Sequence, residues 1–298
     1  MTAPDRGFLV GLLGSGIGPS LSPALHEREA DRLGLRYLYR RLDIDELGVP
    51  AQRAEQVLDA ARLAGYDGLN VTHPCKQLVP ERLDELSDDA AALGAVNTVV
   101  LRHGLASGYN TDLSGFARAL RTGLPGVNND RVLLIGSGGA GSAIAHALLA
   151  TGTGVLDVFD LNTERAAALV QALTTRWGAD RAVRASAPHT SLPGAQGLVH
   201  ATPLGMAAHP GLPVDAELLR PDLWVADAVY RPLRTELVRT ARAAGCRVLD
   251  GGRMAVFQAV DSFRLFTGVE PDADRMLQHF AELTGAESAG SPAVAEVG

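Results

Sequence analysis

Cysteine is scarce in this sequence, and its two cysteines, Cys75 and Cys246, lie far apart and in no CxxC motif. That pattern excludes a disulfide framework and a zinc site built from paired cysteines, and it favours a reducing, cytoplasmic location. The eight histidines form no HExxH motif and show no other close ligand spacing. We therefore predict that the protein holds no metal ion.

Long apolar runs are also missing, since no segment approaches the roughly 18 residues that a membrane-spanning helix needs. The apolar run at residues 8–13 is too short for a signal peptide and has the wrong flanks, so we interpret it as a first strand. No stretch gathers Lys and Arg with aromatic residues, and the net charge is −7. Neither a membrane nor nucleic acid is expected as a partner.

The composition that remains is that of a globular protein, with 46% hydrophobic and 20% charged residues in a chain of 298 residues. That length favours two domains. Short apolar runs alternate with segments of helical periodicity along the whole chain, which predicts an α/β protein with largely parallel sheets. The predicted strands are residues 7–13, 37–43, 68–71, 98–102, 131–135, 155–159, 182–186, 197–201, 223–227 and 247–250.

A cluster of turn-forming residues at 124–130 marks the boundary between the two predicted domains. Residues 1–120 form the first domain, and residues 121–251 form a second α/β unit. Two helices predicted at 253–267 and 274–283 follow the last strand of that unit and could pack on either domain. Residues 286–298 are expected to be a flexible tail.

A glycine-rich turn follows the predicted strand 131–135 and precedes a helix-forming segment. It reads GSGGAG from Gly136 to Gly141, which matches the GxGxxG pattern. Such glycines permit a sharp turn and let a pyrophosphate approach the N–H groups of a helix N-terminus, whose dipole favours negative charge. A second strand follows at the expected distance and ends at Asp160, where this pattern places an acid. The sequence therefore predicts a Rossmann-type dinucleotide-binding domain rather than a turn that serves packing alone.

The residue Asp160 bears on which dinucleotide binds. A carboxylate at this position can accept hydrogen bonds from the ribose hydroxyls of NAD but would repel the 2′-phosphate of NADP. Two alternatives stay open, because Asp160 could merely cap the following helix and Arg165 lies near enough in the sequence to clamp a phosphate. The sequence favours NAD as the cofactor.

Four polar clusters in the first domain stand at predicted strand ends or in loops. They read SLSP from Ser20, NVTHPCK from Asn70, GAVNT from Gly94 and GYNTD from Gly108. Each cluster also has a purely structural explanation. Ser22 and Asp112 are suited to capping helices, Asn97 suits a turn, and a lone loop lysine such as Lys76 is usually solvated.

Taken together, the clusters resemble the shikimate dehydrogenase family, in which SxSP, NVTxPxK, GAVNT and GxNTD precede a GxGGAG cofactor loop in this order. The similarity continues with ATPLGM from Ala201, DAVY from Asp227, and DGGRM from Asp250 leading to Gln258. It covers nearly the whole chain. The segment DLNT from Asp160 and the motif FRLFTGVEP are most similar to the NAD-using quinate/shikimate dehydrogenases of bacteria.

The resemblance implies an enzyme that reversibly oxidises the C3 hydroxyl of shikimate and quinate to the 3-dehydro acid with NAD. Oxidising a secondary alcohol requires a proton acceptor at its oxygen, a role that the resemblance gives to Lys76. Asp112 would orient this lysine and share the hydrogen bonds of the hydroxyl. Ser20 and Ser22 would hold the substrate carboxylate, and the residues implied for the ring hydroxyls are Asn70, Thr72, Asn97 and Gln258.

The resemblance also implies a cofactor site and an arrangement of domains. The implied cofactor residues are Gly136, Gly138, Gly139, Ala140, Gly141, Asp160, Asn162, Arg165, Thr202, Met206, Val229, Tyr230, Gly251 and Met254. The C-terminal helices, residues 252–285, would return to complete the first domain, and the two domains would close around the substrate. A monomer or a homodimer is expected.

Three departures from the family pattern keep alternatives open. NADP-using members carry an arginine immediately before the position of Thr163, and its absence here favours NAD. Ser22 stands where quinate-active relatives often have a threonine, which weakens the prediction of quinate as a substrate. The usual asparagine before Ala-Thr-Pro is His200 here, and the sequence offers no physical account of it. The rivals are an NADP-dependent biosynthetic shikimate dehydrogenase, an aminoquinate or aminoshikimate dehydrogenase, and a protein that senses NAD or shikimate without turnover. Retention of both Lys76 and Asp112 argues against the sensor.

Overall fold

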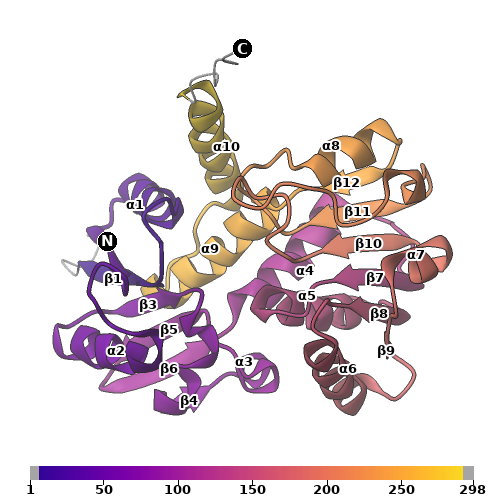
Figure 1. Ribbon diagram of the computed structural model, residues 1–298. Helices are drawn as coiled ribbons and strands as arrows, with labels where there is room; N and C mark the ends of the chain where they lie inside the picture. Colours follow the sequence, from indigo (N-terminus) through magenta and orange to yellow (C-terminus); the bar gives the residue numbers. More distant parts are fainter. Residues whose placement is uncertain (1–6, 291–298) are drawn as a thin grey trace.

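The computed structural model of the protein describes residues 7–290, and its strands form two six-stranded sheets flanked by helices (Figure 1). The first sheet has the order β2-β1-β3-β5-β6-β4. Its strands are β1 (Phe8–Gly14), β2 (Tyr37–Asp43), β3 (Gly68–Val71), β4 (Glu85–Leu86), β5 (Thr98–Arg102) and β6 (Leu105–Tyr109). β1 lies parallel between β2 and β3, whereas β5 is antiparallel to both β3 and β6.

The second sheet is parallel throughout and has the order β9-β8-β7-β10-β11-β12. Its strands are β7 (Arg131–Ile135), β8 (Val155–Phe159), β9 (Ala182–Arg184), β10 (Gly197–His200), β11 (Trp224–Asp227) and β12 (Arg247–Leu249). The chain direction across the sheet reverses between β7 and β10, and ligands of such sheets bind outside the carboxyl ends of the strands at this point. The two-domain α/β class with a Rossmann-type sheet is thereby confirmed.

The helices cover the faces of the two sheets and connect them (Figure 1). They are α1 (Ser22–Arg32), α2 (Ala54–Leu63), α3 (Asp88–Leu93), α4 (Thr111–Gly123), α5 (Gly139–Ala150), α6 (Thr163–Trp177), α7 (Pro188–Ser191), α8 (Glu236–Ala243), α9 (Gly252–Thr267) and α10 (Ala273–Gly290). Short 3₁₀ turns are η1 (Ala51–Arg53), η2 (Cys75–Gln77), η3 (Pro80–Arg82), η4 (Leu192–Gly194) and η5 (Ala216–Leu218).

Every strand predicted from the sequence is present, but β4 and β6 were not predicted. The strand β6 follows β5 after only His103 and Gly104, which both have positive φ angles, 53° and 79°. A two-residue turn with that backbone favours an antiparallel hairpin. β6 is short, and Ser107 and Gly108 interrupt its apolar residues, so it shows no continuous apolar run. The pair His103 and Gly104 was the signal that could have found it.

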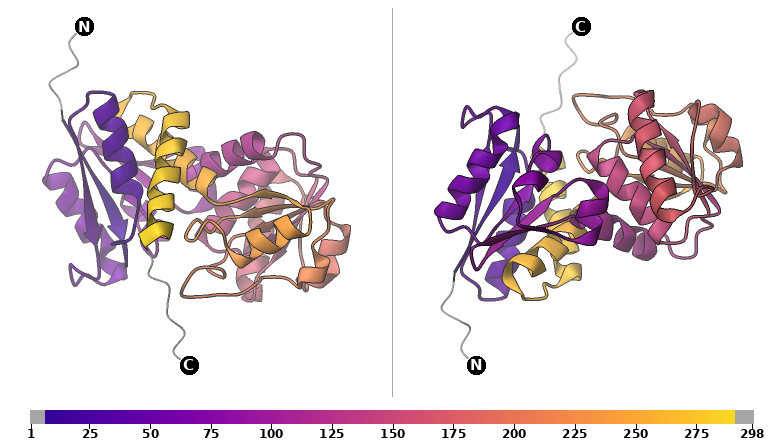
Figure 2. Two further views of the ribbon diagram at one scale, coloured as in Figure 1. Left: turned by 90° about the horizontal axis from the view of Figure 1, so that it is seen from above. Right: turned by 90° about the horizontal axis from the view of Figure 1, so that it is seen from below.

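The C-terminal helices return to the first sheet. α9 leads back from the second sheet, and α10 lies beside α1 (Figure 2). Arg275 of α10 donates from Nε to Oε2 of Glu29 in α1 at 2.8 Å. The side chain of Glu29 is buried. The flexible tail expected at 286–298 falls partly on α10, which continues to Gly290, and partly outside the described residues.

The helices α4 and α9 cross at very short range. One apolar core contains buried side chains of α4, α9 and the second sheet, among them Phe116 and Phe257. At the crossing itself, a Cβ atom added to Gly115 would lie 2.8 Å from the backbone nitrogen of Gln258. The two backbones can approach this closely only because residue 115 has no side chain.

We expect the substitution Gly115→Ala to destabilise the protein by about 1–3 kcal/mol, because its methyl group would force α4 and α9 apart. Urea denaturation followed by circular dichroism measures this. Gly285→Ala is the matched control, since it also adds a methyl group to a helical glycine but meets no atom within 4 Å. A Gly115→Ala protein as stable as the control would show that the crossing tolerates the extra volume.

Candidate active site

Lys76 and Asp112 form an ion pair. Lys76 lies in η2, just after β3, and its Nζ donates to Oδ2 of Asp112 at 2.5 Å. Asp112 lies in the first turn of α4, where Asn110, and not Asp112, provides the capping side chain. Both side chains are largely buried. The capping explanation for Asp112 is therefore wrong, and so is the expectation of a freely solvated lysine.

The composition sets this lysine apart from the other cations. Lys76 is the only lysine in the chain, and the other 26 basic residues are arginine. An arginine side chain stays protonated in proteins, whereas an amine can release and accept a proton. The sequence motif had already singled out Lys76, but this contrast would have found the position without any motif.

The amide of Asn97 orients the ion pair. Its Nδ2 donates to Oδ1 of Asp112 at 2.9 Å, and its Oδ1 accepts from the backbone nitrogen of Thr111 at 2.7 Å. The same Nδ2 lies 3.3 Å from Oε1 of Gln258, which comes from α9. The structure thus brings together four side chains that the sequence implied separately, although Gln258 lies far from the others along the chain.

Asn70 is held by a tyrosine that sequence reasoning missed. The hydroxyl of Tyr39 donates to Oδ1 of Asn70 at 2.7 Å, and Nδ2 of Asn70 lies 3.2 Å from Oγ1 of Thr98. Burial raises the pKa of Tyr39 far above its usual value, so the phenol stays protonated and remains a donor. No local pattern in the sequence indicates this contact. Thr72 lies immediately after β3 and is half-buried.

The hydroxyls of Ser20 and Ser22 lie together, with their Oγ atoms 3.3 Å apart. Leu21 occupies the N-cap position of α1 and makes no side-chain capping bond, so Ser22 is not the cap that a structural explanation predicts. Two guanidinium groups contact the adjoining backbone. Arg41 donates to the carbonyl oxygen of Ser20 at 2.9 Å. Arg231, in the segment that follows β11, donates to the carbonyl oxygen of Pro19.

The glycine turn connects β7 to α5 and fits an anion. Gly136 has a φ angle of 104°, and a Cβ atom there would lie 2.7 Å from the carbonyl oxygen of Ala201. A Cβ atom at Gly141 would lie 2.1 Å from the oxygen of Gly136. In contrast, Gly138 and Gly139 face open space, and Gly138 caps α5 without a side-chain hydrogen bond. The first N–H groups of α5 therefore suit a phosphate group.

Asp160 follows β8, and its carboxylate already has several protein partners. Its Oδ2 accepts from the backbone nitrogen and the hydroxyl of Ser137 at 2.7 and 2.8 Å. Its Oδ1 accepts from the Arg165 guanidinium and from the Asn162 nitrogen, both at 2.8 Å. Burial raises the pKa of Asp160, but these hydrogen bonds together lower it to about 2. The carboxylate is ionised, and Arg165 compensates part of its charge.

The remaining residues implied for the cofactor lie at the same edge of the second sheet. They follow β8, β10, β11 and β12 and are Asn162, Thr202, Met206, Val229, Tyr230 and Gly251, with Met254 in α9. The side chain of Asn162 caps α6 by accepting from the nitrogen of Arg165 at 2.9 Å. Met254 and Gln258 are four residues apart in α9 and share one helix face. α9 therefore connects this edge of the sheet with the Lys76 ion pair.

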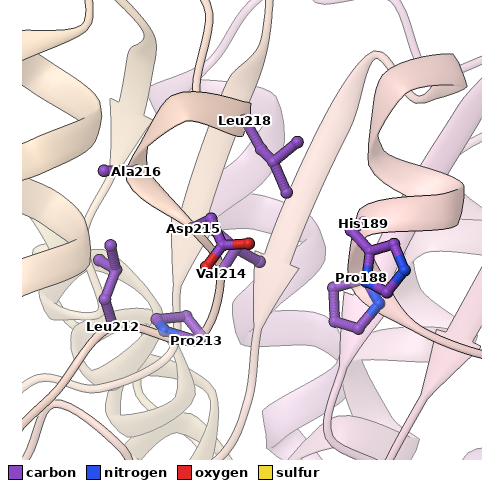
Figure 3. Close-up of a pocket in the computed structure, with 8 residues that line it drawn as sticks. All are labelled: Pro188, His189, Leu212, Pro213, Val214, Asp215, Ala216 and Leu218. Atoms are coloured by element: carbon purple, nitrogen blue, oxygen red, sulfur yellow. The ribbon is translucent and has the colours of Figure 1, made fainter.

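Two surface hollows lie away from these residues. Figure 3 shows one between α7 and the segment 212–218, and another lies near Trp224. Neither is lined by a residue that the sequence assigned to a site. Within residues 7–290, no three His, Cys, Asp or Glu side chains gather where they could hold a metal ion. In the same part of the chain, no helix has both the length and the apolarity of a membrane span.

Comparisons with known proteins identify relatives of the chain. The model of the shikimate dehydrogenase substrate binding domain matches residues 12–99, and that of the shikimate 5′-dehydrogenase C-terminal domain matches residues 252–279. An NADP⁺ shikimate dehydrogenase of Streptomyces avermitilis is 62% identical over 93% of this chain and 96% of its own. An NAD⁺ quinate/shikimate dehydrogenase of Corynebacterium efficiens is 47% identical over 93% of this chain and 98% of its own.

A solved structure has the same fold. Quinate dehydrogenase from Corynebacterium glutamicum in complex with NAD superimposes with a TM-score of 0.87 at 46% identity. The alignment covers 93% of this chain and 99% of that one.

The lowered pKa of Asp160 makes a prediction about stability. An acid whose pKa is lower in the folded state stabilises the protein above its unfolded pKa, 3.8 here, and this contribution is lost as the pH falls to about 2. We expect the free energy of unfolding of Asp160→Asn to depend less on pH than that of the wild type between pH 4 and pH 2.

Denaturant titrations at several pH values measure the difference. Asp222→Asn is the control, because the side chain of Asp222 is 75% exposed and pairs only at the surface. Parallel pH profiles for the wild type and Asp160→Asn would contradict the assignment.

Proposed function

The chain belongs to the shikimate dehydrogenase family, and from that premise we propose that it catalyses the reversible oxidation of the C3 hydroxyl of shikimate with a nicotinamide dinucleotide. One observation carries the proposal. The Lys76 and Asp112 ion pair, oriented by Asn97, lies next to Gln258 of α9, the helix that also carries Met254 at the dinucleotide side.

The ion pair supplies the proton chemistry. When the substrate is oxidised, its hydroxyl proton must leave as hydride leaves the same carbon, so a base has to contact that oxygen. Lys76 takes this role, and in the reverse direction its ammonium group donates the proton to the carbonyl oxygen. Asp112 accepts hydrogen bonds from both Lys76 and Asn97, which fixes its carboxylate and aims the amine. It thereby acts as the orienting partner rather than as the base.

The surrounding side chains match the polar groups of the substrate. Shikimate has one carboxylate and several hydroxyls. Ser20 and Ser22 would bind the carboxylate, and Arg41 and Arg231 add positive charge beside them by binding the adjoining carbonyl oxygens. Neutral groups suit the hydroxyls, and the side chains proposed for them are Asn70, Thr72, Asn97 and Gln258.

The dinucleotide would bind along the carboxyl edge of the second sheet. When bound, its nicotinamide ring supplies the hydride acceptor. The exposed backbone at Gly138 and Gly139 and the N-terminus of α5 would hold the pyrophosphate. Asp160 and Arg165 would lie at the adenosine ribose.

We propose NADP as the preferred dinucleotide. The relative at 62% identity is named for NADP, and the half-exposed Arg165 guanidinium beside Asp160 can bind a 2′-phosphate. The preference for NAD that the sequence suggested rested on the carboxylate of Asp160, and that carboxylate already has protein donors.

NAD is the second candidate. It is favoured by the ionised carboxylate of Asp160 and by the relative at 47% identity, which is named for NAD and for quinate as well as shikimate. Quinate is accordingly the second substrate to test, although Ser22 argues against it. An aminated analogue has no specific support, and the intact ion pair argues against a sensor without turnover.

We expect Lys76→Met to lower kcat at least about a hundredfold, with a smaller effect on KM, because acid–base catalysis is lost. Lys76→Arg should be comparably impaired, because it restores the charge but not a removable proton. Steady-state kinetics with shikimate measure both variants after circular dichroism has shown that they fold. A folded Lys76→Met enzyme with the wild-type kcat would refute the role.

Kinetics of the wild type on shikimate and quinate, each with NAD and NADP, test the choice of cofactor and substrate. We expect Arg165→Ala to raise KM for NADP about tenfold or more, because a charge-assisted hydrogen bond is lost, and to change KM for NAD little. Arg239→Ala, an exposed arginine of α8, is the control. A higher kcat/KM of the wild type with NAD than with NADP would reject the NADP proposal in favour of NAD.

A further inference from the structure

The histidine that replaces the asparagine usual in the family has a complete set of partners. His200 is the last residue of β10 and is paired in register with Asp227, the last residue of β11. Both side chains are buried, with Nδ1 of His200 2.9 Å from Oδ1 of Asp227. On the other side of the ring, Nε2 of His200 lies 2.5 Å from Oγ1 of Thr202.

The hydrogen bonds around Asp227 determine where the protons lie. Its Oδ1 also accepts from the nitrogen of Val229 at 3.0 Å, and its Oδ2 accepts from the hydroxyl of Thr235 at 2.6 Å. The Thr235 hydroxyl itself accepts from the nitrogen of Val238, so its proton points to Asp227. Asp227 is therefore an acceptor throughout, which places a proton on Nδ1 of His200.

The same reasoning applies to Thr202. Its Oγ1 accepts from the nitrogen of Leu204 at 3.2 Å, and with the proton of a neutral His200 on Nδ1, the hydroxyl of Thr202 is the donor to the unprotonated Nε2. Its methyl group faces the glycine turn, since a Cβ atom at Gly136 would lie 2.8 Å from Cγ2 of Thr202. Both branches of this threonine are thus fixed, one by His200 and the other by the turn.

From this arrangement we propose that His200 is a positioning residue for the dinucleotide site. It holds Thr202, and with it the backbone of residues 201–202, against the first glycine of the turn. The chain of contacts runs from Thr235 at the N-terminus of α8 through Asp227 and His200 to Thr202. The inference rests on the proposed dehydrogenase function, because it assigns His200 to the cofactor side of that same site.

The variant His200→Asn separates the two contacts of the ring. An asparagine amide can replace Nδ1–H as the donor to Asp227, but it is too short to reach Thr202. We expect the Kd for NADP⁺, and for NAD⁺, to rise about threefold to tenfold in isothermal titration calorimetry, as for the loss of one neutral hydrogen bond. KM for the dinucleotide should rise in parallel while KM for shikimate stays unchanged.

Thr202→Val should raise Kd by the same factor. The double variant should bind the dinucleotide no more weakly than the single variant with the higher Kd, because both substitutions remove the same interaction. Ser87→Ala is the control. It removes the side-chain cap of α3, which lies outside this chain of contacts, so it should lower stability towards urea while leaving the dinucleotide Kd within about twofold of the wild type.

Nuclear magnetic resonance of protein labelled with ¹⁵N-histidine provides an independent reading. His200 should carry its proton on Nδ1, with Nε2 unprotonated and hydrogen-bonded. A His200→Asn protein with the wild-type Kd, effects that multiply in the double variant, or a proton on Nε2 would each overturn the proposal. A wild type that binds a dinucleotide but does not oxidise shikimate would instead refute the proposed function and leave the binding test intact. Binding of neither dinucleotide would overturn both.

Discussion

The contact between α4 and α9 is the constraint on which the rest of the arrangement depends. α4 begins at Thr111, just after β6 of the first sheet, and carries Asp112 in its first turn, whereas α9 begins after the last strand of the second sheet. Because Gly115 has no side chain, the backbone of Gln258 comes close enough for its amide to meet Asn97. This helix crossing thus fixes how Gln258 of α9, which starts at the carboxyl edge of the second sheet, meets the residues around the ion pair.

In the interior of the candidate site, charged side chains are paired, and the polar side chains that are not in ion pairs are neutral. The buried carboxylate of Asp112 has both Lys76 and Asn97 as donors, which offsets the cost of removing it from water. The amides of Asn70 and Asn97 are likewise held by neighbouring hydroxyls and backbone groups. Guanidinium groups stay at the rim, near Ser20. A substrate bound as proposed would meet side chains that are already ordered, so little conformational entropy would be lost on binding.

The sequence predicted the strands well, because short apolar runs bounded by turn formers leave little freedom in their placement. It failed where a short strand is interrupted by Ser and Gly, as in β6, and where the partner of a side chain lies far along the chain. Nothing local in the sequence indicates that Tyr39 binds Asn70, or that Arg231 reaches the carbonyl oxygen of Pro19. The preference for NAD had a similar origin, since the acidic side chain of Asp160 was visible in the sequence but its hydrogen bonds with Ser137 and Asn162 were not. The domain boundaries and the roles of the site residues stay predictions.

The single lysine has a practical consequence for chemical labelling. Apart from the α-amino group at the start of the chain, Lys76 carries the only aliphatic amine, and it lies in the site itself. Amine-directed reagents that modify most proteins at scattered surface positions would have one internal target here. An isotopically enriched methyl group introduced there by reductive alkylation would report on that one environment, free of overlapping signals from other side chains.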